Sequence, residues 1–139
     1  MAKLSRPQFG RIVDTYCRAW RTKDTELILT LFAPDAIYHE RPFELPIVGH
    51  NGIRSYWDKK VAQEQENVRT EILNLYIDGQ VGIAEWLVEF DDLVDNERKR
   101  MREVAILSIS DDLKITHLRE FWSSQKIRAL EAAHGKSRG

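Results

Sequence analysis

The first half of the chain spaces its apolar residues with the period of an α-helix. From Phe9 to Trp20 these residues fall on a single stripe, as in a helix that packs on one side. Ser5 is the expected N-cap of this helix. The remaining pattern predicts a short helix over 25–32, a brief strand over 36–40, a loop over 41–49 and a third helix over about 51–65.

The second half of the chain changes from a helical period to an alternation of apolar and polar residues. Such alternation is typical of strands that bury one face. It predicts four long strands separated by short polar turns, over 67–79, 80–93, 100–110 and 113–122. Consecutive strands joined by short turns form an antiparallel meander. We therefore predict the α+β class, with helices on one face of a curved sheet and a cavity between the two layers.

The charge balance limits the classes of function. The chain has 139 residues, with 21 Lys and Arg against 22 Asp and Glu, and a formal net charge of −1. Neither nucleic acid nor a membrane surface is an expected partner, because both attract a basic face. The single cysteine, Cys17, excludes an internal disulfide framework.

The length suits one domain over residues 1–139, with a short flexible C-terminal tail from about residue 134. No apolar run reaches the roughly 20 residues of a membrane-spanning helix, and no segment has the features of a signal peptide. We therefore expect a cytoplasmic protein. The four histidines lack the spacing of a metal site, and we expect neither a metal ion nor a cofactor.

Four segments of the chain, taken in order, resemble the nuclear transport factor 2-like superfamily. They are YCRAWRTKD (16–24), LFAPDA (31–36), GHNGIRSYW (49–57) and KITHLREFW (114–122). The resemblance is to the ketosteroid isomerase-like and SnoaL-like polyketide cyclase branches of that superfamily. It implies a cone-shaped α+β barrel, in which a curved antiparallel sheet wraps over three N-terminal helices and encloses a pocket for a small hydrophobic ligand.

Glu40 is the first candidate for a catalytic group. Because strand residues alternate between faces, Glu40 and its neighbour His39 cannot both point into the cavity. In the ketosteroid isomerases the matching position holds the carboxylate that shuttles a proton, so the resemblance implies this role for Glu40. An apolar cavity would raise the pKa of such a base towards neutrality. The alternative is a glutamate at a loop edge, paired with Arg41 or another arginine.

Glu120 is the second candidate, on the last predicted strand. Residues 116, 118, 120 and 122 share one face of that strand, and the resemblance places this face inside the cavity. In SnoaL-like cyclases an aspartate at the position matching Glu120 is the acid or base. The alternative is a buried glutamate that pairs with an arginine. Two carboxylates that face one cavity would separate their pKa values and so divide the roles of acid and base.

Tyr16 is the third candidate, on the first helix. The resemblance implies that its hydroxyl stabilises an oxyanion formed from the substrate, and the alternative is a core tyrosine with a satisfied hydroxyl. The isomerases also carry a protonated aspartate beside the tyrosine, at the position of Ala105 in this chain. Glu103 lies two residues earlier on the same face and is a candidate substitute. Because Ala105 offers no donor, steroid isomerisation itself is not expected.

The walls of the implied pocket are mostly aromatic. Large rings form an apolar, shape-selective surface, although ordinary core packing is the alternative interpretation for each of them. The predicted ligand-binding residues are Phe32, Tyr38, Trp57, Trp86, Glu103, Leu118 and Trp122.

These observations support three hypotheses about function. The first is a cofactor-free acid–base enzyme (isomerase, cyclase or dehydratase) acting on a small hydrophobic carbonyl compound. The second is a binding protein whose carboxylates anchor a cationic or hydroxylated ligand. The third is a protein-interaction domain. The resemblance also implies a homodimer formed through the sheet, in which His117, Arg119 and Phe121 meet a second copy.

Overall fold

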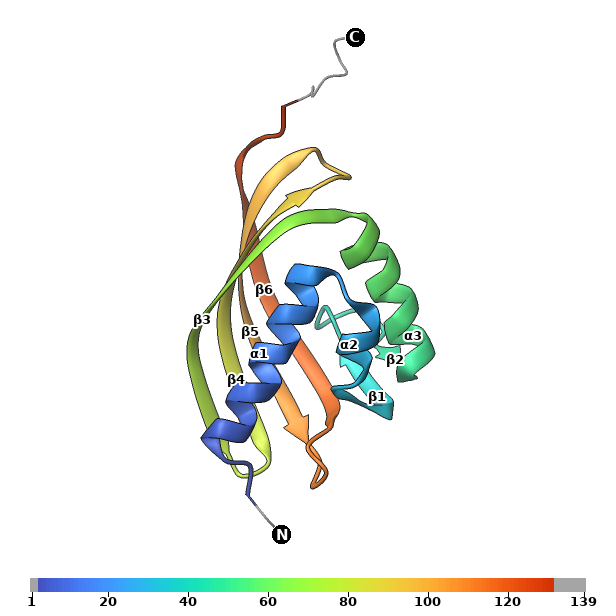
Figure 1. Cartoon of the computed structure of the whole chain (residues 1–139), viewed down its shortest axis with the longest axis vertical. Coiled ribbons are helices and arrows are strands. Elements are labelled where there is room, and N and C mark those ends of the chain that lie inside the picture. Colours follow the sequence, from blue (N-terminus) through green and yellow to red (C-terminus); the bar gives the residue numbers. More distant parts are fainter. Residues whose placement is uncertain (1–2, 132–139) are drawn as a thin grey trace.

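The computed structural model describes residues 3–131 of the chain. Its helices are α1 (Arg6–Thr22), α2 (Thr25–Leu29) and α3 (Gly49–Tyr56), and α3 continues into a π-helical segment, η1 (Trp57–Gln63). The strands are β1 (Phe32–His39), β2 (Ile47–Val48), β3 (Gln65–Asp78), β4 (Val81–Asp92), β5 (Glu97–Ile109) and β6 (Ile115–Ala129). They form one sheet in the order β2-β1-β6-β5-β4-β3 (Figure 1). The predicted α+β class is confirmed.

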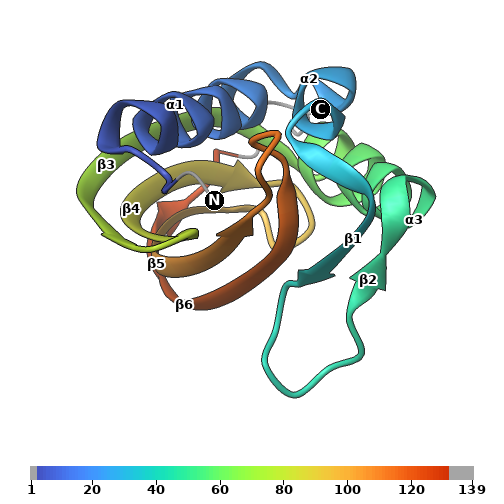
Figure 2. The ribbon, with the colours of Figure 1, turned by 90° about the horizontal axis from the view of Figure 1, so that it is seen from below.

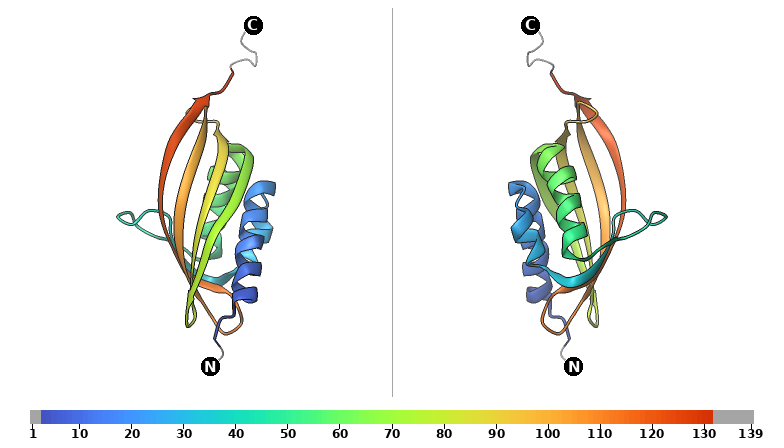
Figure 3. Two further views of the ribbon diagram at one scale, coloured as in Figure 1. Left: turned by 90° about the vertical axis from the view of Figure 1, so that its left-hand side faces the viewer. Right: turned by 90° about the vertical axis from the view of Figure 1, so that its right-hand side faces the viewer.

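The sheet curves around one side of the helices. Viewed from below, β3 to β6 form a curved wall, and α1, α2 and α3 lie across its open side (Figure 2). Seen from the sides, the helices occupy one face of the sheet, while the connection between β1 and β2 projects beyond the other face (Figure 3). This arrangement leaves the concave face of the long strands turned towards α1, α3 and η1.

The four long strands pair in the antiparallel meander that the sequence predicts. The edge beyond β6 differs, because β1 runs parallel to β6, with Tyr38 opposite Leu118. Parallel neighbours require a long connection, and here α3 and the other three long strands lie between β1 and β6 in the chain. The parallel pairing fixes Tyr38 beside the inward-facing residues of β6.

Helix α1 forms where the apolar stripe predicts it. The Ser5 hydroxyl accepts a hydrogen bond from the Gln8 backbone N–H, and the Gln8 side chain accepts one from the Ser5 N–H. This capping box satisfies two backbone donors that the first turn leaves free. The predicted stripe is buried, with Phe9 and Val13 fully covered. Consequently Tyr16, on the same stripe, faces the sheet.

Several boundaries differ from the prediction. Helix α2 ends at Leu29 instead of at the predicted residue 32, and β1 begins at Phe32 instead of at the predicted residue 36. The pairing of β1 with β6 shifts register between Phe32 and Ile37, and Pro34, which has no N–H for a ladder, lies in this gap. Strand β6 continues seven residues past the predicted end at 122. The flexible tail predicted from about 134 lies outside the described residues.

The third helix also differs from the prediction in kind. It begins at Gly49, and its second half, from Trp57, is a π-helix rather than an α-helix. The spacing of apolar residues does not distinguish an α-helix from a short π-helix, because in both forms an apolar residue returns to the buried side about once per turn. Within residues 3–131, no helix is both long and apolar enough to cross a membrane.

Candidate active site

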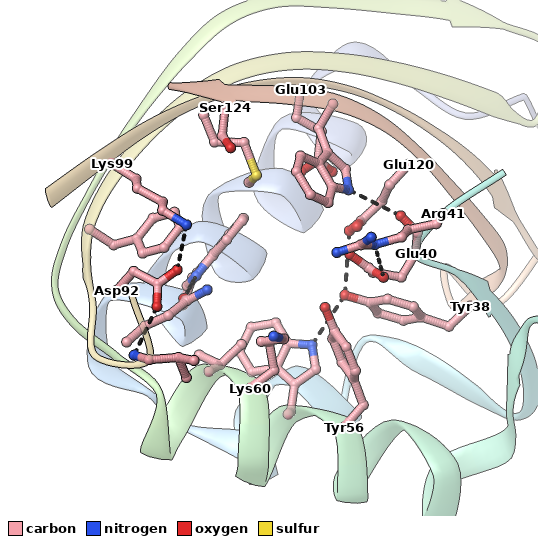
Figure 4. A pocket seen from close by; sticks show the side chains of 18 of the residues that line it. Tyr38, Glu40, Arg41, Tyr56, Lys60, Asp92, Lys99, Glu103, Glu120 and Ser124 are labelled. Carbon is pink, nitrogen blue, oxygen red and sulfur yellow. Dashed lines mark hydrogen bonds and ion pairs between the residues drawn. The ribbon is translucent and has the colours of Figure 1, made fainter. Parts of the chain in front are cut away.

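A cavity of about 230 Å³ lies between the concave face of the sheet and the helices α1, α3 and η1 (Figure 4). Rings make up much of its wall, and carboxyl groups from β1, β5 and β6 face into it. The aromatic lining residues are Tyr16, Trp20, Tyr38, Tyr56, Trp57, Phe90 and Trp122. The acidic residues at the β6 side of the cavity are Glu40, Glu103 and Glu120.

Glu120 is buried in this wall and is held by two tyrosines. The hydroxyls of Tyr16 and Tyr38 donate to its Oε2 atom at 3.2 and 3.3 Å. The two hydroxyls lie 3.0 Å apart, and Trp57 donates its Nε1–H to Tyr38 at 3.3 Å. Only 5% of Glu120 is exposed. The first helix, β1 and η1 therefore each contribute one ring to the environment of a single carboxyl group.

Glu103 lies beside Glu120 on the same face of the sheet. In the β5–β6 ladder Glu103 pairs with Trp122, and Ala105 pairs with Glu120. The two glutamates are thus diagonal neighbours, a relation that brings long side chains within reach of each other. Ala105, which is fully buried, leaves room for the longer side chain opposite it.

Both carboxyl groups hold their protons more tightly than a glutamate in water. Burial raises the pKa of Glu103 to about 8. Burial also raises the pKa of Glu120 well above its usual value, and the adjacent Glu103 raises it further. The Glu103 oxygens accept no hydrogen bond from any residue in the described range 3–131. The two carboxyl groups therefore share one low-dielectric site, in which ionisation of one opposes ionisation of the other.

Glu40 lies at the rim of the cavity. It follows His39 at the end of β1, and its side chain is paired with Arg41 Nε at 3.3 Å. The Arg41 guanidinium also lies over the Trp122 ring, 5.1 Å from the centroid, and Trp122 donates its Nε1–H to the Glu40 carbonyl at 3.1 Å. The arginine-paired alternative from the sequence is the arrangement observed.

Tyr16 matches the alternative given from the sequence, a core tyrosine with a satisfied hydroxyl, and its predicted oxyanion role stays a prediction. It lines the cavity, yet it is 1% exposed and its ring stacks on Trp86 at 5.2 Å. Burial raises the pKa of Tyr16 well above its usual value, so the hydroxyl keeps its proton. That hydroxyl is engaged with Tyr38 and Glu120. In this arrangement Tyr16 orients the Glu120 carboxyl.

The predicted ligand-binding residues divide into two groups. Tyr38, Trp57, Glu103 and Trp122 line the cavity. Phe32, Trp86 and Leu118 are buried in the core behind that lining and do not contribute to it. In the case of Trp86, the Tyr16 ring stacks on the indole.

Sequence reasoning missed several lining residues. Phe90 and Met101 share strand parity with Trp86 and Glu103, so alternation along β4 and β5 carried the signal for both. Gln65 had no signal, because a polar residue at a predicted helix end is ordinarily exposed. Within residues 3–131, no group of three or more His, Cys, Asp or Glu side chains is placed to hold a metal ion.

The comparisons with known proteins agree with this architecture. A family model described as the SnoaL-like domain matches residues 13–118. No curated protein sequence matches the chain.

Three solved structures illustrate the structural likeness. The epoxide hydrolase/cyclase-like enzyme SalBIII, described in pyran ring formation in the polyether salinomycin, aligns with a TM-score of 0.74 at 21% identity over 84% of this chain and 94% of that one. A hypothetical protein with a ketosteroid isomerase-like fold from Catenulispora acidiphila DSM 44928, in complex with trimethylamine, gives 0.71 at 21% over 81% and 85%. An M. tuberculosis LEH-like epoxide hydrolase gives 0.67 at 16% over 81% and 80%. At these identities the likeness concerns the fold.

Proposed function

Because the chain belongs to the SnoaL-like domain family, we propose that its cavity is the active site of a cofactor-independent acid–base enzyme. Its substrate is a small, largely apolar compound with a reactive oxygen function. One observation carries the proposal: Glu103 and Glu120 lie side by side in the cavity wall, both are buried with raised pKa values, and no lysine or arginine within residues 3–131 forms an ion pair with either. Such strongly perturbed groups in a concave site are typical of catalytic acids and bases.

The pair divides the two roles. Burial raises the pKa of Glu120, and Tyr16 and Tyr38 orient its carboxyl group, so it donates a proton to the substrate oxygen as that oxygen gains negative charge. Glu103, once ionised, removes a proton from the substrate. Glu120 loses one proton and Glu103 gains one, so the total charge of the pair is unchanged, and proton exchange between them or with solvent restores the starting protonation states. General acid–base catalysis of this kind contributes roughly 10²- to 10⁴-fold in rate.

Two reaction types need this arrangement. In the first, Glu103 removes a proton next to a carbonyl group, the step that begins isomerisation, cyclisation and dehydration. In the second, Glu120 protonates an epoxide oxygen while Glu103 deprotonates the attacking water or hydroxyl. The second type enters the proposal because two structural neighbours are described as an epoxide hydrolase/cyclase-like enzyme and an epoxide hydrolase.

The test is a turnover assay with hydroxy-epoxides and β,γ-unsaturated ketones, followed by mass spectrometry and compared between variants. Glu103→Gln and Glu120→Gln keep the side-chain volume and replace the ionisable carboxyl group with an amide that neither gives up nor takes up a proton near neutral pH, so each is expected to lower turnover at least about 100-fold. Glu85→Gln, on the outer face of the sheet, is the matched control and retains turnover. Unchanged turnover in both inner-face variants, or no turnover of any compound by the wild-type chain, contradicts the proposal.

A second candidate is the binding of a small amine without chemistry. Rings and carboxylates together are the usual recognition elements for alkylammonium cations, and the C. acidiphila neighbour is described in complex with trimethylamine. An ammonium group beside Glu103 and Glu120 would favour their ionised forms and release their protons. Calorimetry with trimethylamine in two buffers of different ionisation enthalpy measures this release. A binding enthalpy that is the same in both buffers contradicts this candidate.

We also propose that two copies associate through the outer face of the sheet. Val104 and Phe121 are cross-strand partners there, and both are exposed. Around them the face carries charges of both signs, including Glu85 paired with Arg102, so it can complement a second copy about a two-fold axis. Sedimentation should show a dimer at micromolar concentration, and Phe121→Glu should yield a monomer. A wild-type monomer under the same conditions contradicts this proposal.

A further inference from the structure

Gln65 is a buried amide on the cavity wall, apart from the two glutamates. It is the first residue of β3, only 8% exposed, and lines the cavity. It pairs with Asp92 in the β3–β4 ladder, whereas Glu103 pairs with Trp86, six residues earlier on β4. Figure 4 shows Asp92 and Lys99 across the cavity from Glu40 and Glu120. The ladder therefore places Gln65 towards the end of the cavity remote from the acids.

The orientation of the Gln65 amide is fixed by its neighbour. Trp20 donates its Nε1–H to Gln65 Oε1 at 2.8 Å, and both side chains are buried. An indole N–H is only a donor, so the Gln65 amide oxygen must face it. The amide nitrogen is then the terminal atom on the side away from the indole. Trp20 is in turn fixed by edge and tilted contacts with Tyr16 and Trp57, at 6.3 and 6.4 Å between ring centroids.

The Gln65 amide nitrogen makes no hydrogen bond to any residue in the described range. The nitrogen is not one of the fully buried polar atoms that lack a partner, so it keeps some access to solvent, and a free donor in a cavity wall is available to a ligand. The position is also set by two backbone irregularities: η1 ends at Gln63, and the β3–β4 pairing shifts register just after Glu66. π-Helical turns occur disproportionately at functional sites.

The charged groups near this end of the cavity are already paired with one another. Lys99 binds Asp92 at 2.8 Å, and it also contacts Asp95. Lys60 binds Glu64 at 3.2 Å. These pairs need no counter-charge from a ligand, whereas the two N–H groups of Gln65 are free to donate to one.

From this geometry we infer that Gln65 is a ligand-positioning residue that donates to an uncharged oxygen at the end of the ligand remote from Glu103 and Glu120. The inference deepens the proposed function, on which it rests, by naming a substrate class. The substrate is a neutral, elongated molecule with an apolar middle and an oxygen function at each end. One oxygen meets the paired acids, and the other, a carbonyl, ether, ester or hydroxyl, meets the Gln65 amide.

Binding of octane-1,8-diol and 1-octanol, measured by isothermal titration calorimetry, tests this inference without any turnover. Both probes present one hydroxyl to the acids, and only the diol presents a second one to Gln65. In Gln65→Met, which keeps the length of the side chain, the preference for the diol over the alcohol should fall by about three- to tenfold, which is the effect of one neutral hydrogen bond. Gln65→Glu, measured at alkaline pH where the introduced carboxyl group is ionised, still accepts from Trp20 but has no N–H or O–H to donate, and it should lose the preference equally.

The affinity for 1-octanol is the internal control and should stay within about twofold of the wild-type value in both variants. An unchanged preference, equal weakening of both probes, or no binding of either probe to the wild-type chain overturns the role of Gln65. The result is separable from the catalytic proposal. A chain that turns over substrate but shows no change in preference refutes Gln65 alone, and a chain without turnover that shows the change retains the binding role and refutes the catalysis.

Discussion

The inner and outer faces of the long strands treat the same residue type in opposite ways. On the outer face Glu85 receives Arg102 Nη2 at 2.8 Å and Asn74 Nδ2 at 2.9 Å, and these hydrogen bonds lower the pKa of its carboxyl. On the inner face Glu103, the next residue after Arg102, has no such partner in the described chain, and burial raises its pKa to about 8. Adjacent residues of β5 face opposite sides of the sheet, so Arg102 forms a salt bridge on the outer face whereas Glu103 is a candidate acid or base on the inner face.

This difference changes the meaning of the net charge. The formal value of −1 counts every carboxyl group as ionised. The raised pKa values of Glu103 and Glu120 keep protons on both groups near neutral pH, which makes the actual charge more positive by up to two. The outer acids are matched by arginines, so a charge balance near zero conceals an acidic interior. A total charge alone does not separate the two faces.

The largest expected effect is on the pH dependence of stability. Because the pKa of Glu103 is raised by folding, the native state holds a proton that the unfolded chain releases above about pH 4. Stability therefore falls as the pH rises from about 4 to about 8. Glu103→Gln removes this dependence, so its free energy of unfolding relative to the wild-type chain should increase by about 3 kcal/mol between pH 5 and pH 8.

Urea denaturation at several pH values measures this difference, and the groups that do not interact with Glu103 cancel in it. Glu85→Gln is the matched control: because the pKa of Glu85 is lowered, its stabilising contribution is lost only below about pH 4, and the difference from wild type should stay nearly constant between pH 5 and pH 8. Parallel pH profiles for wild type and Glu103→Gln would mean that Glu103 ionises freely in the folded protein.

An intermediate loss of stability is expected when a tyrosine hydroxyl that contacts Glu120 on the inner face is removed. The Tyr38 hydroxyl contacts Tyr16, Glu120 and Trp57, so Tyr38→Phe leaves the buried Trp57 N–H without its acceptor. Tyr16→Phe leaves Glu120 with one remaining donor. Losses of about 2 kcal/mol for Tyr38→Phe and about 1 kcal/mol for Tyr16→Phe are expected by thermal or urea unfolding. A reversed order would show that Tyr16 is the principal partner of Glu120.

Strand alternation and helical period were sufficient to predict which faces are buried. The inward orientation of Glu120 follows from its parity with Leu118, and the separation of His39 from Glu40 follows from the same rule. The resemblance supplied the arrangement of these elements in space. These local signals are reliable because each depends only on the geometry of its own element.

The division of roles among the acids was not predictable from the sequence. Glu40 carried the strongest motif, yet it lies at the rim with Arg41, whereas Glu103 entered the prediction only as a substitute for an absent aspartate. Depth of burial and the nearest partner depend on tertiary packing, which period and parity do not encode. The same reason explains the missed Gln65, whose role depends on an indole 45 residues earlier in the chain.

The smallest expected effect is the salt dependence of stability on the outer face, where added salt weakens the ion pair between Glu85 and Arg102. Glu85 and Arg102 are solvent-accessible and lie 2.8 Å apart, and the distance over which dissolved ions screen charges shortens from roughly 10 Å at 0.1 M salt to roughly 3 Å at 1 M. The cost of Glu85→Gln should therefore decrease as salt is added, whereas the pH-dependent effect of Glu103→Gln should persist, because burial rather than long-range charge produces it. Repeating both urea titrations at low and at molar salt measures the two responses. Equal salt sensitivity in both variants would show that water and ions reach Glu103, and that the inner face differs from the outer face only in its partners and not in its solvation.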